Sequence, residues 1–381
     1  MNINHSTCNH NLYMSRRNII ISMAATAISL SAAITSSAQN TTKLTATKAN
    51  DYGLVYTLPS AVINVTLEAE RTESRPGEFY NYATKYLKTS PIQSKSQKWT
   101  LSGVQLTQTA VPDDEQRYNV QFKSGTPVTI VIDSNNAPVS INDEGYAPQP
   151  AEKPTLQPRQ AQPSILDTPA ARQAMTEEMI QSTSTAKRAE LAADKIFELR
   201  QNRNDIISGN ADGMPKDGQA MQLALDNLTQ QEEALTAMFT GVTVSSSEIA
   251  TYTFVPGEES QKIVIARISP VKGLIAADDL AGDPIYLNYK VVSKGTMPLT
   301  DKGEERRFPK GGVAYRIPGT AEISIIYDGK ELDKKTLHIP QLGVVFGMEP
   351  SMFSDKKTPG YAHFDPLTGA IKETGIATVN R

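Results

Sequence analysis

The chain has 381 residues, of which 39% are hydrophobic and 21% charged, with 38 Lys and Arg against 41 Asp and Glu. This length suffices for one large or two ordinary domains with a sizeable core. The slightly acidic balance lacks the basic excess typical of nucleic-acid-binding proteins, so no nucleic-acid partner is predicted.

The first 38 residues are predicted to be a secretory signal peptide. Arg16 and Arg17 precede an apolar run from Ile19 to about Ile34, and small residues follow up to Ala38. This order is typical of export signals. The apolar run is about 16 residues, shorter than the roughly 20 that a membrane-spanning helix needs. We therefore predict a protein exported to the periplasm or cell surface, with no integral membrane span after cleavage.

Cleavage would also remove the only cysteine, Cys8, so the mature chain would have no disulfide and no thiolate ligand or nucleophile. Removing Arg16 and Arg17 from the 38 basic residues leaves 36 against 41 acidic ones, a net charge of −5. Of the histidines, His338 and His363 remain.

Residues 50–147 are predicted to form an N-terminal β-rich domain. Apolar and polar residues alternate in "AVINVTLEAE", "YNVQF" and "PVTIVID", which is typical of half-buried strands. In "KWTLSGVQL" the alternation slips by one residue at Ser102 and Gly103, which predicts a β-bulge. "PGEFYNYATKYLK" has helical spacing and predicts a small helix crossing the sheet. The apolar strand positions are Ile63, Val65, Leu67, Ala69, Tyr118, Val120, Phe122, Val128, Ile130 and Ile132.

Residues 148–167 are predicted to be a Pro-rich linker, because "APQPAEKPTLQPRQAQP" has five prolines in seventeen residues. A helical hairpin is predicted over 168–240. Its first helix would begin at Thr168 and Pro169 and run to about Ile207, and its second would run from about Asp217 to Phe239.

Residues 241–381 return to the two-residue period and are predicted to form a C-terminal β-rich domain. "DPIYLNYKVV" alternates, and "AEISIIYDGKEL" turns at Asp328 and Gly329, a strong β-hairpin signal. The predicted fold class is α+β, mostly β, with two antiparallel β-rich domains joined by the Pro-rich linker and the helical hairpin.

The segment "SGNADGMPKDGQ" between the two helices partly matches a calcium-binding loop. Counted from Ser208, Asn210, Asp212 and Gly213 occupy the third, fifth and sixth positions of such a loop. The first position is a neutral hydroxyl, and the twelfth is Gln219, which cannot clamp the ion with two carboxylate oxygens. The glycines and the proline of the segment are equally typical of a turn, so we favour a turn and assign no metal ligand.

No residue is assigned a catalytic or cofactor-binding role. Glu232 and Glu233 could form a carboxylate pair, but solvated helix charges are the favoured interpretation. His338 is expected on the solvent side of a strand, and His363 is expected to pack beside Tyr361. Nucleotide-binding glycine motifs and the nucleophile elbow are missing from the sequence. We therefore predict a protein that is not an enzyme and needs no cofactor.

The stretches "YGLVYTLPSAVINVTLEAERTESRPGEFYNYATKYL", "QQEEALTAMFTG" and "GVAYRIPGTAEISI", with the "MPKDG" connector, resemble domain-of-unknown-function family 4831. The resemblance covers roughly residues 50–375. It implies a secreted or periplasmic protein of Bacteroides-type bacteria. It implies no activity, ligand or catalytic residue, and it supports the turn interpretation of "MPKDG".

Three functions fit these features. The favoured hypothesis is a non-catalytic envelope or surface module that binds a glycan or an envelope protein. The first alternative is a carboxylate-dependent hydrolase of carbohydrate or cell-wall polymer, which requires two carboxyl groups about 5 to 9.5 Å apart. The second is an envelope assembly factor that binds a protein partner through an uncovered apolar stripe on the hairpin.

Overall fold

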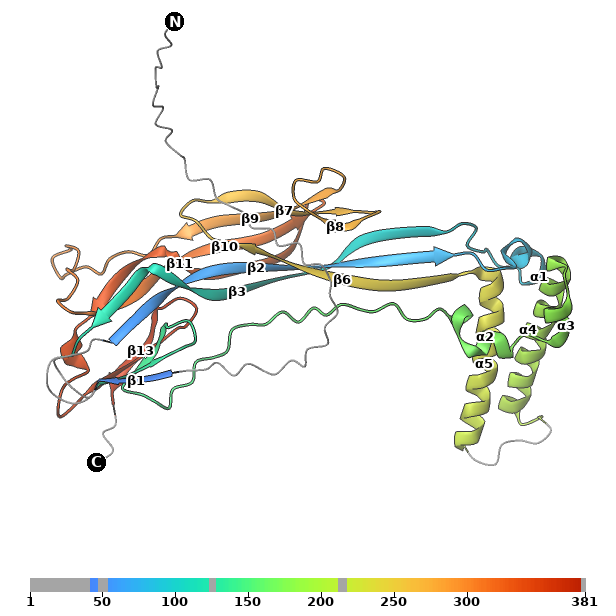
Figure 1. Cartoon of the computed structure of the whole chain (residues 1–381), viewed down its shortest axis with the longest axis horizontal. Helices are drawn as coiled ribbons and strands as arrows, with labels where there is room; N and C mark the ends of the chain where they lie inside the picture. The colour runs from blue at the N-terminus through green and yellow to red at the C-terminus, as the bar shows by residue number, and fades with distance from the viewer. Residues whose placement is uncertain (1–41, 47–53, 123–127, 212–217, 378–381) are drawn as a thin grey trace, which may run out of the picture. The chain divides into compact units, whose positions relative to one another are not determined.

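Three antiparallel sheets and a group of helices make up the part of the chain that the structure describes (Figure 1). This structure is a computed structural model, and it describes residues 42–46, 54–122, 128–211 and 218–377. These residues belong to one compact unit, 38–381. The predicted signal peptide, residues 1–38, lies outside the described residues.

The central element is the long strand β2 (Leu54–Arg75), which pairs with β3 (Ser96–Val120) on one side and β6 (Val242–Phe254) on the other. Its apolar positions follow the predicted two-residue period, and all four are fully buried. They contact the second sheet and form the main core. The prediction of a half-buried strand is therefore confirmed. The four positions are Ile63, Val65, Leu67 and Ala69.

The β-bulge predicted in β3 is confirmed. Glu68 faces Gly103 and the next residue, Ala69, faces Leu101, so Ser102 has no partner position on β2. A Cβ atom on Gly103 would lie 2.9 Å from the Glu68 carboxylate and 3.2 Å from the Leu156 side chain. Glycine at the slip therefore lets the Pro-rich segment approach the sheet closely.

The second sheet has the order β11-β10-β9-β7-β8 and packs its apolar face against β2 and β3. The predicted hairpin at Asp328 and Gly329 joins β10 to β11, and both residues have positive φ, 49° and 71°. These are the angles of the tight turn that Asp-Gly favours. The strands are β7 (Gln261–Ser269), β8 (Gly273–Ile275), β9 (Asp283–Ser293), β10 (Val313–Tyr327) and β11 (Lys330–Met348).

The third sheet, β1-β4-β5-β12-β13, combines strands from both ends of the chain. Ile141 of β5 lies opposite Ala362 of β12. Because β6 also pairs with β2, strands of both predicted β regions share two sheets, and the two-domain layout is not confirmed. Strand β1 precedes residue 50, where the predicted N-terminal β-rich domain begins, and no sequence pattern predicted it. The bounds are β1 (Thr42–Ala46), β4 (Val128–Ile132), β5 (Pro138–Ile141), β12 (Gly360–Phe364) and β13 (Ile371–Ile376), and a short 3-10 helix, η3 (Pro350–Met352), precedes β12.

The helical region differs from the prediction in its first half. The continuous helix expected from Thr168 to Ile207 is wrong, since the chain breaks it into three. The side chains of Thr176 and Ser184 accept hydrogen bonds from the backbone N–H groups of Met179 and Lys187, so each starts a new helix. The helices are η2 (Ile165–Asp167), α2 (Pro169–Gln173), α3 (Glu177–Gln181), α4 (Thr185–Ser208) and α5 (Gly218–Thr240).

The end of α5 and the small helix meet at one hydrophobic cluster. Gly241 ends α5 with a φ of 84°, as predicted. The small helix consists of η1 (Tyr80–Tyr82) and α1 (Ala83–Tyr86). It does not cross the sheet as expected, because Phe79 packs on Phe239 of α5 with ring centroids 5.4 Å apart.

The Pro-rich segment is extended, but its contacts attach it to the three-stranded sheet. The backbone N–H of Thr155 donates to the Gln105 side chain on β3 at 2.8 Å. Further on, Arg159 contacts Glu70 of β2 at 3.4 Å and reaches Ser247 of β6. The segment therefore crosses the sheet on the face opposite the core, and a free linker is not confirmed.

Candidate functional site

A groove of about 700 Å³ lies between the end of the Pro-rich segment and the start of β6. The two walls are antiparallel, because Arg159 lies beside Ser247, whereas Asp167 binds Arg75, the residue of β2 that pairs with Val242, at 2.6 Å. Protein pockets for small ligands range from about 300 to 1,000 Å³, so the space is large enough for a ligand. Polar lining residues include Gln160, Gln162 and Ser164 on one wall and Thr243 and Ser245 on the other.

The two walls touch at one end of the groove and then diverge. The backbone N–H of Ser247 donates to the carbonyl oxygen of Arg159 at 2.8 Å, and the N–H of Arg159 donates to Ser247 Oγ at 2.9 Å. β6 is the edge strand of its sheet, since β2 lies on its other side. The groove therefore opens along a sheet edge.

The groove has many hydrogen-bonding groups and few charges. Its lining consists of amide, hydroxyl and apolar side chains with one charged residue, Arg159, whose guanidinium also contacts Glu68 and Glu70 at 3.9 and 3.4 Å. No histidine, cysteine or carboxylate belongs to this lining. The groove thus offers hydrogen-bond donors and acceptors without a general acid or base.

A smaller hollow of about 270 Å³ on the hairpin contains both glutamates considered as a carboxylate pair. Arg200 Nε donates to Glu232 Oε1 at 2.6 Å, and the guanidinium of Arg203 binds the other oxygen. Glu232 is buried, so its interpretation as a solvated charge is wrong, whereas Glu233 is exposed. Two arginines of α4, three positions apart on one helix face, bind this glutamate of α5 and hold the two helices together.

His363 lies in a cluster that sequence reasoning only partly anticipated. The ring of Tyr146 stacks on it at 3.8 Å with an interplanar angle of 6°, and Tyr361 lies 4.8 Å away. His363 Nε2 is 2.8 Å from Asp143 Oδ2, and Nδ1 is 3.5 Å from Glu373 Oε2. The packing expectation names Tyr361 correctly, but no sequence pattern joins the two carboxylates, which come from other elements.

The pKa of both tyrosines of this cluster is raised by their surroundings. Burial raises the pKa of the Tyr146 hydroxyl, and the charges of Asp365 and Glu373 add to that rise. The hydrogen bond that the Tyr361 hydroxyl donates to Glu373, at 2.8 Å, raises the pKa of Tyr361. Both phenols therefore stay protonated at neutral pH, and the Tyr361 hydroxyl acts as a hydrogen-bond donor.

The remaining sequence candidates lie apart from the groove. His338 is exposed on β11, as predicted, with Nδ1 3.4 Å from Thr320 Oγ1. Gly209 ends α4 with a φ of 76°, consistent with a turn, but residues 212–217 of the calcium-like segment lie outside the described residues. In the described ranges, no group of three or more histidine, cysteine, aspartate or glutamate residues is arranged to hold a metal ion.

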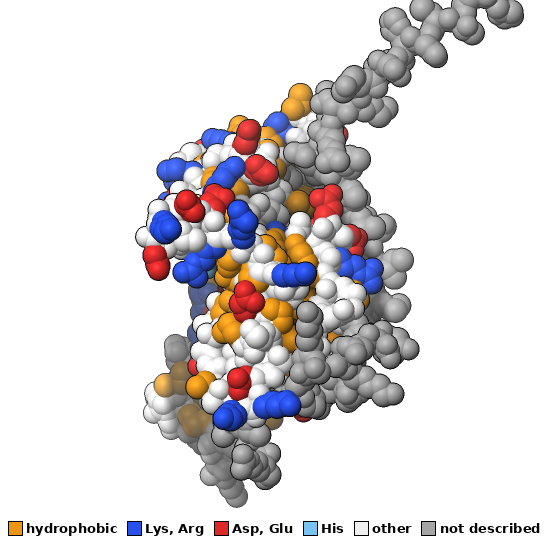
Figure 2. All heavy atoms as spheres, turned by 90° about the vertical axis from the view of Figure 1, so that its left-hand side faces the viewer, with side chains coloured by type: hydrophobic (Ala, Val, Ile, Leu, Met, Phe, Trp, Pro, Cys, Tyr) orange, Lys and Arg blue, Asp and Glu red, His pale blue; other side chains and the backbone are white. Residues whose placement is uncertain are grey.

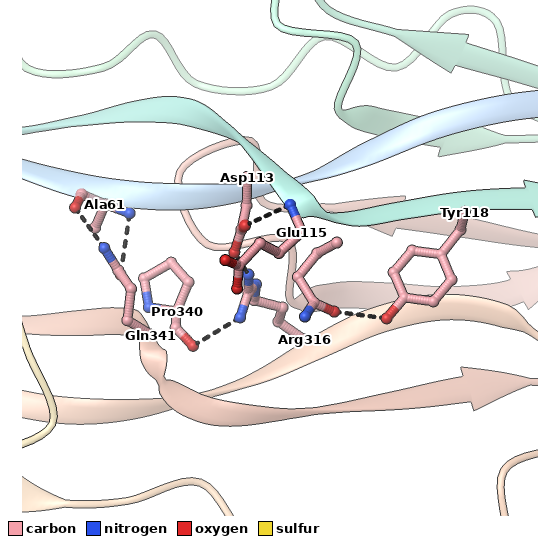
Figure 3. A network of polar contacts seen from close by, with 8 residues as sticks. Ala61, Asp113, Glu115, Tyr118, Arg316, Pro340 and Gln341 are labelled. Carbon is pink, nitrogen blue, oxygen red and sulfur yellow. Dashed lines mark hydrogen bonds and ion pairs between the residues drawn. The ribbon is translucent and has the colours of Figure 1, made fainter. Parts of the chain in front are cut away.

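A partly buried polar network joins the three-stranded sheet to the second sheet (Figure 3). The guanidinium of Arg316 on β10 binds the Asp113 carboxylate on β3 and donates to the Pro340 carbonyl at 3.3 Å. Gln341 on β11 exchanges two hydrogen bonds with the backbone of Ala61 on β2. Asp113 and Ala61 belong to the three-stranded sheet, and Arg316 and Gln341 belong to the second sheet, so these contacts hold the two sheets together.

Figure 2 shows the face on the left-hand side of Figure 1, where apolar side chains lie on the surface with charges of both signs around them. The aromatic ring of Phe308 packs on Phe346 at 6.3 Å, and Tyr315 packs on the same ring at 6.2 Å. These contacts continue the core to the surface at the start of β10 and the end of β11.

Among the described helices, none combines the length and the apolar character that a membrane crossing needs. No curated protein and no solved structure matches the chain. The model of one protein family, the domain of unknown function DUF4831, matches residues 52–372, and the chain therefore belongs to this family.

Proposed function

We propose that this protein is an exported, non-catalytic binding module of the cell envelope, and that the groove between the Pro-rich segment and β6 is its binding site. The observation that carries the proposal is the groove itself: about 700 Å³ lined by amides and hydroxyls and bounded by an open sheet edge. Export rests on the sequence pattern of residues 1–38. The envelope setting rests on the same pattern.

The hydrolase alternative finds less support. A glycosidase needs two carboxyl groups with room between them for the sugar and a water molecule. Asp143 and Glu373 contact opposite nitrogens of His363, so an imidazole ring stands between them. Glu232 binds two arginines with both oxygens and is not free to act as an acid or base.

The assembly-factor alternative has one observation in its favour. Phe197 and Ile207 on α4 and Leu223 on α5 are 51%, 63% and 65% exposed. Large apolar side chains on a two-helix arm are available for a protein partner. Phe197 lies under the guanidinium of Arg200 at 5.6 Å, which covers part of its ring.

The binding site can be tested with a label that fills it. Residues 39–381 contain no cysteine, so Thr243→Cys can be labelled with a bulky maleimide inside the groove. Thr253→Cys, also exposed on β6 but outside the groove, is the matched control. Binding to arrays of host, plant and bacterial glycans and to a random peptide library is measured with calcium and with chelator. We expect the label at position 243, and not at 253, to abolish binding; ligands unaffected by either label would contradict the proposed site.

A further inference from the structure

We infer that the groove takes an extended polypeptide segment of a partner protein, which pairs with the open edge of β6 as an additional strand. This inference rests on the proposed function and names its ligand class. β-strand addition relies on main-chain hydrogen bonds from an unpaired sheet edge, and side-chain pockets only adjust specificity.

One hydrogen bond shows which backbone N–H and C=O groups of β6 point away from β2. In an antiparallel ladder, the N–H and C=O of one residue point to the same side, and every second residue points the same way. Ser247 donates its N–H to Arg159 and therefore points away from β2. The β2–β6 register has no shift between Val242 and Phe254. The backbone groups of Ser245 and Thr243 consequently also point away from β2, toward the groove.

These outward groups have no backbone partner among the described residues. The hydrogen bonds that join β6 to the Pro-rich segment stop at Ser247. Thr243 and Ser245 are exposed, and both line the groove. An edge of this kind is a template for another strand.

The chain's own segment cannot extend this pairing. If the antiparallel register of Arg159 and Ser247 continued, Ala161 would lie opposite Ser245 and Pro163 opposite Thr243. Proline has no N–H to donate, and its ring prevents a regular ladder. The segment instead diverges into η2, where the Ser164 side chain accepts from the Leu166 N–H. The divergence leaves room for a strand from another chain.

The lining indicates which polypeptide fits. The wall opposite β6 presents the Gln160, Gln162 and Ser164 side chains, which donate and accept hydrogen bonds without charge. Arg159 is already neutralised by Glu68 and Glu70. Pro163, Ile165, Val242 and Val244 add apolar surface to the lining. The best occupant is therefore an uncharged segment with small polar and apolar side chains, held mainly through its backbone.

The test uses octapeptides selected from a random phage-displayed library against residues 39–381, then synthesised with N-methyl groups on alternate residues. In an added strand, the N–H groups of one set of alternate residues face β6 and those of the other set face away. We expect methylation of one set to weaken binding about tenfold or more, since the two N–H groups that donate to the carbonyl oxygens of Thr243 and Ser245 are lost. Methylation of the other set should leave binding unchanged.

Two substitutions of Ser245 test the same main-chain hydrogen bonding from the protein side. Ser245→Pro removes an N–H that does not serve the pairing with β2, and it should weaken peptide binding about three- to tenfold, since one main-chain hydrogen bond is lost. Ser245→Ala keeps that N–H and should bind as the unchanged protein does. Circular dichroism and the melting temperature of each variant confirm that the fold is retained.

The remaining outcomes separate this inference from the proposed function. Ligands that the Thr243→Cys label blocks, but that tolerate methylation of either set, would overturn strand addition and leave the groove as a binding site. Peptides or glycans that bind regardless of the label would overturn both.

Discussion

Asp113 on β3 and Arg316 on β10, 203 positions apart, form an ion pair between two sheets in which the arginine is buried and the aspartate is partly exposed (Figure 3). Arg316 is 5% exposed, and its Nε has no hydrogen-bond partner. The guanidinium therefore depends on the Asp113 carboxylate for compensation of its charge. Removing one partner of such a pair leaves a buried charge, which is far more costly than removing both.

We predict that Asp113→Ala lowers the free energy of unfolding by about 3 to 5 kcal/mol. The double variant Asp113→Leu with Arg316→Met should recover most of this loss, because no charge then remains buried. Urea denaturation of the single and double variants measures both. Asp114→Asn, at the exposed neighbour, is the control. A double variant as unstable as the single one would contradict the explanation.

Glu232 is predicted to stabilise the hairpin through its two arginines. Glu232→Gln should lower the free energy of unfolding by about 2 kcal/mol, between the values for exposed and for buried ion pairs, because Arg200 and Arg203 remain partly exposed. The exposed neighbour gives the control, Glu233→Gln, with no expected change. Thermal unfolding followed by the helical circular dichroism signal compares the two, and equal melting temperatures would show that the pair is unimportant.

Gly77 lies where the chain leaves β2 toward the helices, and we predict that a larger residue there destabilises the protein. A Cβ atom there would lie 2.1 Å from the backbone oxygen of Met238, which itself accepts from the Phe79 N–H at 2.7 Å. Gly77→Ala should therefore destabilise the protein by about 1 to 3 kcal/mol, since backbone must move. Gly257→Ala, with no atom within 4 Å of its Cβ, should be tolerated. Denaturation midpoints of the two variants measure the difference in stability, and equal midpoints would contradict the prediction.

Alkaline pH should destabilise the fold through Tyr289. Burial raises the pKa of this tyrosine from 10.0 to about 12. Between these values the unfolded chain ionises while the folded chain does not, so the stability that the neutral ring provides is present below pH 10 and is lost toward pH 12. Tyr289→Phe should reduce the loss of unfolding free energy between pH 8 and pH 11 by about 1.4 kcal/mol.

The comparison between the two pH values isolates ionisation from the hydrogen bond that the Tyr289 hydroxyl donates to Gly257, at 2.9 Å. That bond is lost in Tyr289→Phe at both pH values. If the unchanged protein and Tyr289→Phe lost the same free energy between pH 8 and pH 11, the effect of burial on this tyrosine would be refuted.

The sequence by itself determined the local features of this protein. Alternation placed Ile63, Val65 and Leu67 on one buried face, because side chains of a strand point to opposite sides in turn. The slip at Gly103 gave the bulge, and Asp328 with Gly329 gave the hairpin turn, since each depends on a few consecutive residues. Stretches such as "QQEEALTAMFTG" and "GVAYRIPGTAEISI" also indicated the family.

Only the tertiary structure decided which strands share a sheet and which polar groups meet. No local pattern pairs β5 with β12, or places Asp143 beside His363, 220 positions away. The groove likewise exists because the Pro-rich segment crosses the sheet and meets β6 at Ser247. Such contacts form where long-range packing of the apolar faces brings distant segments together, and a two-residue or 3.6-residue period carries no information about the partner.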